Sequence, residues 1–394
     1  MSIAPSFHRP MPYRRWALAG AVIVLGLALG QAPARAQFDA PPQDQPDMLL
    51  TPAMRTATID SLAAALEHSY VFPDVAARTA AALKAKLKKG GYGGLDSATA
   101  FADSLSSDLR AIGKDRHFRV GYWHRDLPVD AFTEHGPSPE ERARAAVMAR
   151  RLNHGFERVQ RLMGNVGYLD LRAFDGTPEA GALAMAAMTL LGGSDALIID
   201  LRRNGGGDPN MITLLLSWLF PADDRVHVND FYLREGNRTE QYFTMTTIPG
   251  PRYVDKELYV LTSHRTGSAA EEFAYDIKNL KRGTLVGEPT WGGANPGEIV
   301  RLGPHFAAFI SNGRAINPVS HTNWEGVGVE PDVKTSADDA FKTAHVAALT
   351  KLIDKETDPE RKPALERALQ MVKDAPVERL ELGSPPPTRV AKGS

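Results

Sequence analysis

A serine stands where an apolar segment gives way to the start of a helix, a place where its hydroxyl could act as a nucleophile. The apolar segment Leu258–Ser263 is followed by a short turn to Ser268 and then by Ala269–Glu271. A serine at a strand-to-helix turn projects its hydroxyl, and free amides at the helix start can stabilise an oxyanion. The same residues also fit a capping box, with Glu271 three positions after Ser268. This segment by itself leaves both roles open.

A run of three glycines follows a second apolar segment. Leu197–Leu201 leads through Arg-Arg-Asn into Gly205–Gly207. Glycine lets backbone amides approach a ligand closely, so this loop could bind an anion or an oxyanion, although a plain turn is the alternative. The loop does not fit a nucleotide-binding motif, because Asn210 replaces the last glycine of the dinucleotide fingerprint and no Gly-Lys-Ser/Thr follows.

The elements around these residues alternate between strands and helices. The expected strands are 166–174, 196–201, 226–235, 258–263 and 284–286, and the expected helices are 178–191, 209–219 and 269–280. Such alternation predicts a mainly parallel α/β sheet covered by helices, with the turns at one edge forming the site. The segment after 286 is expected to be all strand up to Val333.

The flanking regions have a helical pattern. Apolar residues at helical spacing over 51–112 predict about three helices, and the alternation in His117–Tyr122 predicts a strand. We therefore expect a small helical-bundle domain over 51–126 that ends in a strand. A charged helical linker is expected over 127–163, and two further helices over 336–374.

Composition restricts the partners of the chain. It has 394 residues, 43% of them hydrophobic, so it can bury a sizeable core. Lys plus Arg number 46 and Asp plus Glu number 47, so no overall basic charge favours nucleic acid as a partner. The chain contains no cysteine, which excludes disulfides, thiol nucleophiles and thiolate zinc sites.

The N-terminus has the pattern of an export signal. Arg14 and Arg15 precede an apolar run over 16–30, and Ala34–Ala36 fits a cleavage site. The apolar run is shorter than the roughly 20 residues that span a bilayer, so we expect no stable membrane insertion after cleavage. The sequence thus predicts a signal peptide over 1–36, a flexible spacer over 37–50, a periplasmic or secreted protein, and a Pro-rich tail over 375–394.

Four ordered motifs point to a family. They are Asp200–Gly207, Thr266–Glu272, Gly287–Thr290 and Glu325–Asp332. In this order and spacing they resemble the carboxy-terminal-processing (tail-specific) serine peptidases, in the branch near interphotoreceptor retinoid-binding protein and the tricorn protease core. The resemblance implies a crotonase-like peptidase core of layered strands and helices over 164–335. It also implies a peptide or protein substrate, and no cofactor is indicated.

The resemblance assigns roles to several residues. It implies that Ser268 is the nucleophile and that the oxyanion donors are the backbone amides of Ala269 and of Gly205 or Gly206. The tail-specific branch places its base, a lysine, at the position of Gly293, and no lysine occurs between Lys281 and Val333.

The base must therefore come from elsewhere. The other branch uses a histidine in an Asp-x-His setting, which Asp115-Arg116-His117 matches, so His117 is the predicted base. His321 is the rival base. Glu325 matches a glutamate that completes the tricorn-like site, although a structural salt bridge or a contact to a substrate amine are alternatives.

No metal is predicted, because no His-Glu-x-x-His motif and no histidine pair with the spacing of a zinc site occur. The sequence thus predicts an exported serine peptidase that forms an acyl-enzyme. The alternative is a non-catalytic protein that binds apolar ligands on the same scaffold.

Overall fold

The computed structural model describes residues 41–42, 44–129, 131–132, 139–377 and 379–380. The predicted signal peptide (1–36), the first part of the predicted spacer and most of the predicted Pro-rich tail lie outside these residues. The described residues all belong to one unit, residues 34–394. None of the helices in this part of the chain has the length and apolar character needed to cross a bilayer.

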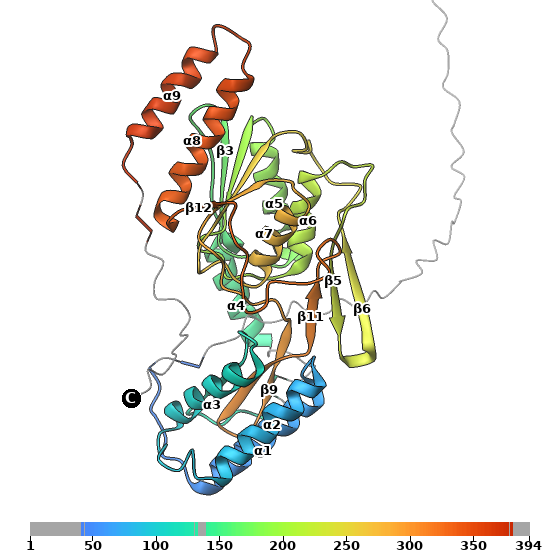
Figure 1. Cartoon of the computed structure of the whole chain (residues 1–394), viewed down its shortest axis with the longest axis vertical. Coiled ribbons are helices and arrows are strands. Elements are labelled where there is room, and N and C mark those ends of the chain that lie inside the picture. The colour runs from blue at the N-terminus through green and yellow to red at the C-terminus, as the bar shows by residue number, and fades with distance from the viewer. Residues whose placement is uncertain (1–40, 43, 130, 133–138, 378, 381–394) are drawn as a thin grey trace, which may run out of the picture. The chain divides into compact units, whose positions relative to one another are not determined.

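A six-stranded sheet forms the centre of the core, in the order β12-β8-β7-β4-β3-β2 (Figure 1). Its strands are β2 (Phe156–Leu162), β3 (Val166–Leu171), β4 (Ala196–Asp200), β7 (Glu257–Thr262), β8 (Thr284–Gly287) and β12 (Val333–Lys334). All neighbouring pairs run parallel except β2 and β3. The predicted, mainly parallel sheet is confirmed.

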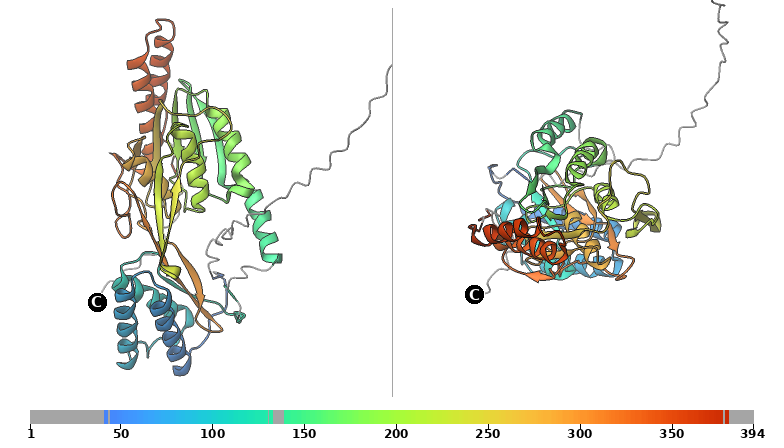
Figure 2. Two further views of the ribbon diagram at one scale, coloured as in Figure 1. Left: turned by 90° about the vertical axis from the view of Figure 1, so that its right-hand side faces the viewer. Right: turned by 90° about the horizontal axis from the view of Figure 1, so that it is seen from above.

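Helices cover both faces of this sheet (Figure 2). They are α5 (Thr177–Leu191), α6 (Pro209–Leu219), α7 (Ala269–Asn279), α8 (Ala337–Lys355) and α9 (Lys362–Asp374). Successive residues of a strand point to opposite faces, so Leu169 and Ile199 pack with α5, α6 and α7 while Tyr168 and Ile198 pack with α8 and α9. Residues buried on both faces make the strands almost continuously apolar. The α/β class of the core is confirmed.

The N-terminal helices pack on a sheet that they share with the core segment. Helices α1 (Pro52–Ser69), α2 (Pro73–Lys88) and α3 (Ala98–Gly113) lie against the antiparallel sheet β1-β10-β9, as Figure 1 shows for β9. Its strands are β1 (Arg119–Tyr122), β9 (Gly297–Arg301) and β10 (Phe306–Ser311). The β9–β10 hairpin thus completes the apolar core of the helical region. One example is the edge-on packing of Phe101 on Phe306, whose ring centroids are 5.8 Å apart.

The structure differs from the sequence-based expectations at several segments, among them the stretch 317–332, which was expected to be strand but forms turns and loop. His117 was expected within a strand but lies in a turn, two residues before β1. The expected helical linker holds α4 (Pro139–Arg151) and the short helix η1 (Asn153–Gly155), but also β2, which belongs to the large sheet. Strand β2 was not predicted from the sequence, because it is an edge strand with mostly exposed side chains and lacks an alternation of apolar and polar residues.

A third, antiparallel sheet has the order β11-β5-β6. Its strands are β5 (His227–Leu233), β6 (Arg238–Phe243) and β11 (Gly313–Ile316), and η2 (Glu235–Asn237) connects β5 to β6. The segment expected to be a strand of the parallel sheet after α6 is β5 of this separate sheet.

Candidate active site

Ser268 occupies a strained turn between β7 and α7. Ser268 is the N-cap of α7 and has φ 52° and ψ −121°. Residues other than glycine rarely adopt this backbone conformation. Strained backbone of this kind is concentrated at functional sites. The Ser268 N–H donates to Glu271 Oε2 at 2.8 Å, so the predicted capping interaction is present. The serine is therefore held at a strand-to-helix turn, where the sequence predicts it.

The glycine loop lies directly against this turn. A Cβ added to Gly206 would be 2.9 Å from Ser268 Cβ and 3.0 Å from the Ala269 nitrogen, so only glycine fits at this position. Asn204 shapes the loop, because its Oδ1 accepts the Gly206 N–H (2.9 Å) while its Nδ2 donates to the Leu171 carbonyl (2.9 Å). The predicted oxyanion residues therefore lie together around Ser268, but the Gly206 amide already has an acceptor.

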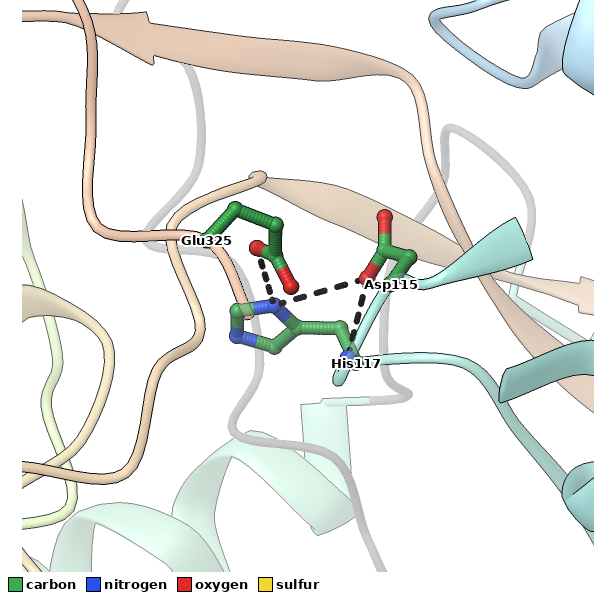
Figure 3. Close-up of side chains that lie close together, drawn as sticks. All are labelled: Asp115, His117 and Glu325. Atoms are coloured by element: carbon green, nitrogen blue, oxygen red, sulfur yellow. Dashed lines mark hydrogen bonds and ion pairs between the residues drawn. The ribbon is translucent and has the colours of Figure 1, made fainter. Parts of the chain in front are cut away.

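His117 lies beside two carboxylates (Figure 3). Its Nδ1 is 4.0 Å from Asp115 Oδ1 and 4.0 Å from Glu325 Oε2. This nitrogen is buried and has no hydrogen-bond partner among the described residues. Figure 3 shows Nε2, the other ring nitrogen, on the side away from both carboxylates. The imidazole is thus oriented with Nδ1 toward the acids and Nε2 away from them.

Hydrogen bonds fix both carboxylates. Those of Glu325 come from the backbone N–H groups of Arg116 (2.8 Å), Ala294 (2.6 Å) and Asn295 (3.1 Å). Asp115 accepts the His117 N–H at 2.9 Å and the Asn295 side-chain amide at 3.1 Å. The two acids therefore connect the turn that bears His117 to the segments before β9 and after β11.

Burial shifts the pKa values of this cluster. It raises the pKa of Glu325 to about 8, with the charge of Asp115 adding to the rise and the three backbone N–H donors opposing it. Burial lowers the pKa of His117, while the charge of Asp115 acts in the opposite direction. A lowered pKa keeps the imidazole neutral near pH 7, as a proton acceptor requires.

The same three residues are those that could hold a metal ion. Donor atoms of Asp115, His117 and Glu325 lie within 4.8 Å of one another, the only such group of three or more in the described part of the chain. All four carboxylate oxygens already accept an N–H hydrogen bond.

Trp291 and Gly293 lie between the histidine and the serine turn. The Trp291 and His117 rings pack edge-on, with their centroids 4.9 Å apart. A Cβ added to Gly267 would be 3.4 Å from Trp291 Cε3. A Cβ on Gly293 would be 2.6 Å from His117 Cε1. No hydrogen bond joins His117 to Ser268 within the described residues, and Trp291 contacts His117 on one side and lies beside Gly267, the residue before Ser268, on the other. Gly293, at the lysine position of the tail-specific branch, thus leaves room for the imidazole.

Glu271 connects the turn at Ser268 to this segment, a role beyond the predicted cap. Besides the Ser268 N–H, it accepts hydrogen bonds from Thr290 Oγ1, from the Gly292 N–H (2.5 Å) and from the Gly293 N–H (2.9 Å). Burial raises its pKa to about 7, and these donors oppose the rise. Sequence reasoning missed this role because the donors lie about 20 residues away.

The rival base does not share this environment. His321 is exposed in the turn after β11, where its N–H donates to the Asn317 carbonyl at 2.9 Å. A third histidine, His264, pairs with Glu288 at 2.9 Å and joins the ends of β7 and β8. Of these histidines, His117 is the one that lies beside two acids, the buried Asp115 and the half-buried Glu325.

Helix α7 also carries two buried acids that take no part in this arrangement. Glu272 and Asp276 lie one helical turn apart, and Asn317 Nδ2 donates to Asp276 Oδ1 at 3.1 Å. Burial raises the pKa of Glu272 to about 8, and the charge of Asp208 adds to the rise. Burial also raises the pKa of Asp276, with the charge of Glu272 adding to the effect.

The variant Glu272→Gln is expected to flatten the pH dependence of stability. An acid whose folded pKa exceeds its unfolded pKa of about 4.3 lowers the free energy of unfolding as pH rises between the two, by at most about 1.4 kcal/mol per pH unit. The variant should therefore gain stability over the wild type from about pH 4 to about pH 8. Urea unfolding across this range measures the difference, and parallel curves would contradict it.

The comparisons with known proteins agree with this architecture. Residues 165–335 match the model of peptidase family S41, and residues 47–162 match the N-terminal domain of peptidase S41 in eukaryotic IRBP. The chain belongs to peptidase family S41, with an IRBP-like N-terminal domain. The family resemblance noted from the four motifs is confirmed.

Individual relatives cover parts of the chain. The chloroplastic carboxyl-terminal-processing peptidase 2 of Arabidopsis thaliana is 31% identical over 42% of this chain and 31% of its own length. The tricorn protease of Thermoplasma volcanium is 24% identical over 54% of this chain and 18% of its own length. The chain thus spans a third or less of these two relatives.

A solved structure from Parabacteroides merdae, described as a candidate peptidase, has a TM-score of 0.51 and 16% identity. The match covers 77% of this chain and 99% of the Parabacteroides merdae chain, which shows a common fold.

Proposed function

We propose that the protein is an exported serine peptidase that cleaves peptide bonds through an acyl-enzyme, with Ser268 as nucleophile and His117 as general base. One observation carries the proposal: Ser268 lies on a strained turn against the glycine loop, and Trp291 joins this turn to an imidazole with two carboxylates at Nδ1. Named relatives that are peptidases support it.

In the first step Ser268 Oγ attacks the carbonyl carbon of the substrate while its proton passes to His117 Nε2. The carbonyl oxygen becomes an oxyanion. We assign its stabilisation to the Ala269 amide, which is at the first position of α7 and has no intrahelical acceptor, and to the Gly205 amide. Gly206 is the weaker candidate, since its N–H is bonded to Asn204.

The protonated imidazole then donates its proton to the leaving amine, and the acyl group stays on Ser268. Water attacks the ester with His117 again as base, which releases the carboxylic acid and restores the serine. Asp115 and Glu325 act through His117 as positioning residues beside Nδ1, and the charge of Asp115 favours the imidazolium when it forms. The 4.0 Å separations mean that the ring or the acids move closer when this charge develops.

Export and substrate class are part of the proposal. The N-terminal pattern of two arginines, an apolar run and small residues supports export to the periplasm or medium. Peptides or proteins are the proposed substrates. The alternative, a non-catalytic protein that binds apolar ligands, is not favoured by relatives whose names are those of peptidases.

Digestion of a peptide mixture followed by mass spectrometry tests the activity. The wild type should generate new peptide ends that Ser268→Ala does not generate. A folded wild type whose digest equals that of the variant would refute the peptidase assignment.

The pH profile of kcat/KM is expected to lose activity on the acid side as His117 becomes protonated. Burial lowers the pKa of His117 from 6.5, so the fall should occur below pH 6.5. The negative charge of Asp115 favours the imidazolium, so Asp115→Asn should move the fall to still lower pH. Steady-state rates between pH 4 and 8 measure both midpoints. A midpoint that stays in place or moves to higher pH in the variant would contradict this role.

A further inference from the structure

The edge strand β9 starts beside the candidate active site. Gly293 lies against the His117 ring, and the next two residues donate their backbone N–H groups to Glu325. Strand β9 begins at Gly297, four residues after Gly293, which is at most about 14 Å of extended chain. A peptide whose reacting carbonyl lies at Ser268 can therefore extend along this strand.

The hydrogen-bond pattern defines which backbone groups of β9 point outward. The Leu302 N–H donates to the Phe306 carbonyl at 2.8 Å, so Leu302 faces β10. Backbone groups alternate in direction along an antiparallel strand, so Val300 also faces β10 and Ile299 faces away from it. Outside the ladder with β10, no described residue provides a partner for the backbone N–H or C=O of Ile299.

Two other sheet edges near the site are closed. On β1 the outward residue is Val120, whose N–H donates to Ser106 Oγ (2.8 Å) and whose C=O accepts from it (3.2 Å). On β11 the Gly313 N–H donates to the Pro296 carbonyl (3.1 Å). The Ala315 carbonyl next to it accepts from Asn323 Nδ2 (2.8 Å). The edge of β9 has no such cover among the residues that the structure describes.

The side chains next to this edge are suited to an extended peptide. Ile299 is half-buried on the apolar cluster of Trp123, Leu127 and Ala307. An added strand would place its main chain beside Ile299 and alternate side chains next to the half-buried Ile299 side chain.

We propose that the substrate binds as an extended peptide along β9, adding a fourth strand to the β1-β10-β9 sheet through the backbone N–H and C=O of Ile299. The proposal rests on the proposed peptidase function. It assigns part of the binding of substrate to main-chain hydrogen bonds, which tolerate many side chains.

The variant Ile299→Pro removes the outward N–H and leaves the ladder to β10 intact, a change that edge strands accept. The ratio of the peptide kcat/KM to the rate of Ser268 labelling by a small fluorophosphonate is expected to fall about tenfold, the effect of one lost hydrogen bond. The control is Thr239→Pro, at a residue that faces outward on the edge strand β6, for which the ratio should stay within about twofold of the wild type.

A series of hexapeptides with one N-methylated residue each, tested on the wild-type protein, checks the proposal without any variant. Only every second N-methyl group should lower kcat/KM, because alternate amides of a bound strand face β9. An unchanged ratio in Ile299→Pro, or a series without alternation, would overturn the proposal. Absence of labelling in a folded wild type would instead refute the peptidase function itself.

Discussion

Ser268→Ala is expected to reduce kcat for peptide hydrolysis by about 10⁴- to 10⁶-fold, and His117→Ala by a similar factor. The serine hydroxyl is a weak nucleophile at neutral pH until a base takes its proton, so either loss disables the same step. The double variant should be no slower than either single variant, because residues that act as a unit lose their effect together. The kcat of each of the three variants is measured with a fluorogenic peptide.

Thermal unfolding of each variant provides the control, since His117 packs against Trp291 and could contribute to stability. A folded His117→Ala protein that keeps more than about a tenth of the activity would contradict the general-base role. In that case His321→Ala is the next variant, because His321 is the rival base from the sequence.

Gly293→Ala is expected to lower kcat/KM by about 100-fold, because catalysis is sensitive to displacements of about 1 Å. The added methyl group would lie 2.6 Å from His117 Cε1 and 2.3 Å from Trp291 Cζ3, so the two rings must move. The change leaves Ser268, both acids and the glycine loop unaltered. Steady-state rates with the same fluorogenic peptide measure the effect.

The matched control is Gly303→Ala. Gly303 lies between β9 and β10, and an added Cβ there has no heavy atom within 4 Å, so activity should stay within about twofold. A Gly293→Ala protein with wild-type activity would show that the position of His117 does not matter for the reaction.

Local patterns in the sequence were sufficient to predict the strand-to-helix turn at Ser268 and the glycine loop. Ser268 and Gly206 lie in segments where a buried strand runs into a helix or a tight turn, so the chemistry of each could be inferred from neighbours in the chain. The alternating strands and helices of the core were likewise predicted, since their apolar runs are long and bounded by turns. The edge strand β2 was missed because its side chains are mostly exposed.

Long-range contacts explain what the sequence could not provide. The Arg116 N–H bonds to Glu325, which is 209 residues away, and the side chain of Asn295 bonds to Asp115, 180 residues away. The pairing of β1 with β10, which brings the N-terminal helices onto a hairpin of the core segment, is of the same kind. Such contacts depend on the whole fold. Motif matching indicated His117 as base, but the positions of Trp291 and Gly293 beside it required the structure.

The most direct test of the central claim is labelling of the protein by a fluorophosphonate probe, with the modified residue located by peptide mass spectrometry. We expect the wild type to carry one adduct on Ser268, Ser268→Ala to carry none, and His117→Ala to react at least about 100-fold more slowly. A folded wild type that stays unlabelled, or a Ser268→Ala protein that is labelled as fast as the wild type, would contradict the assignment of Ser268 as nucleophile.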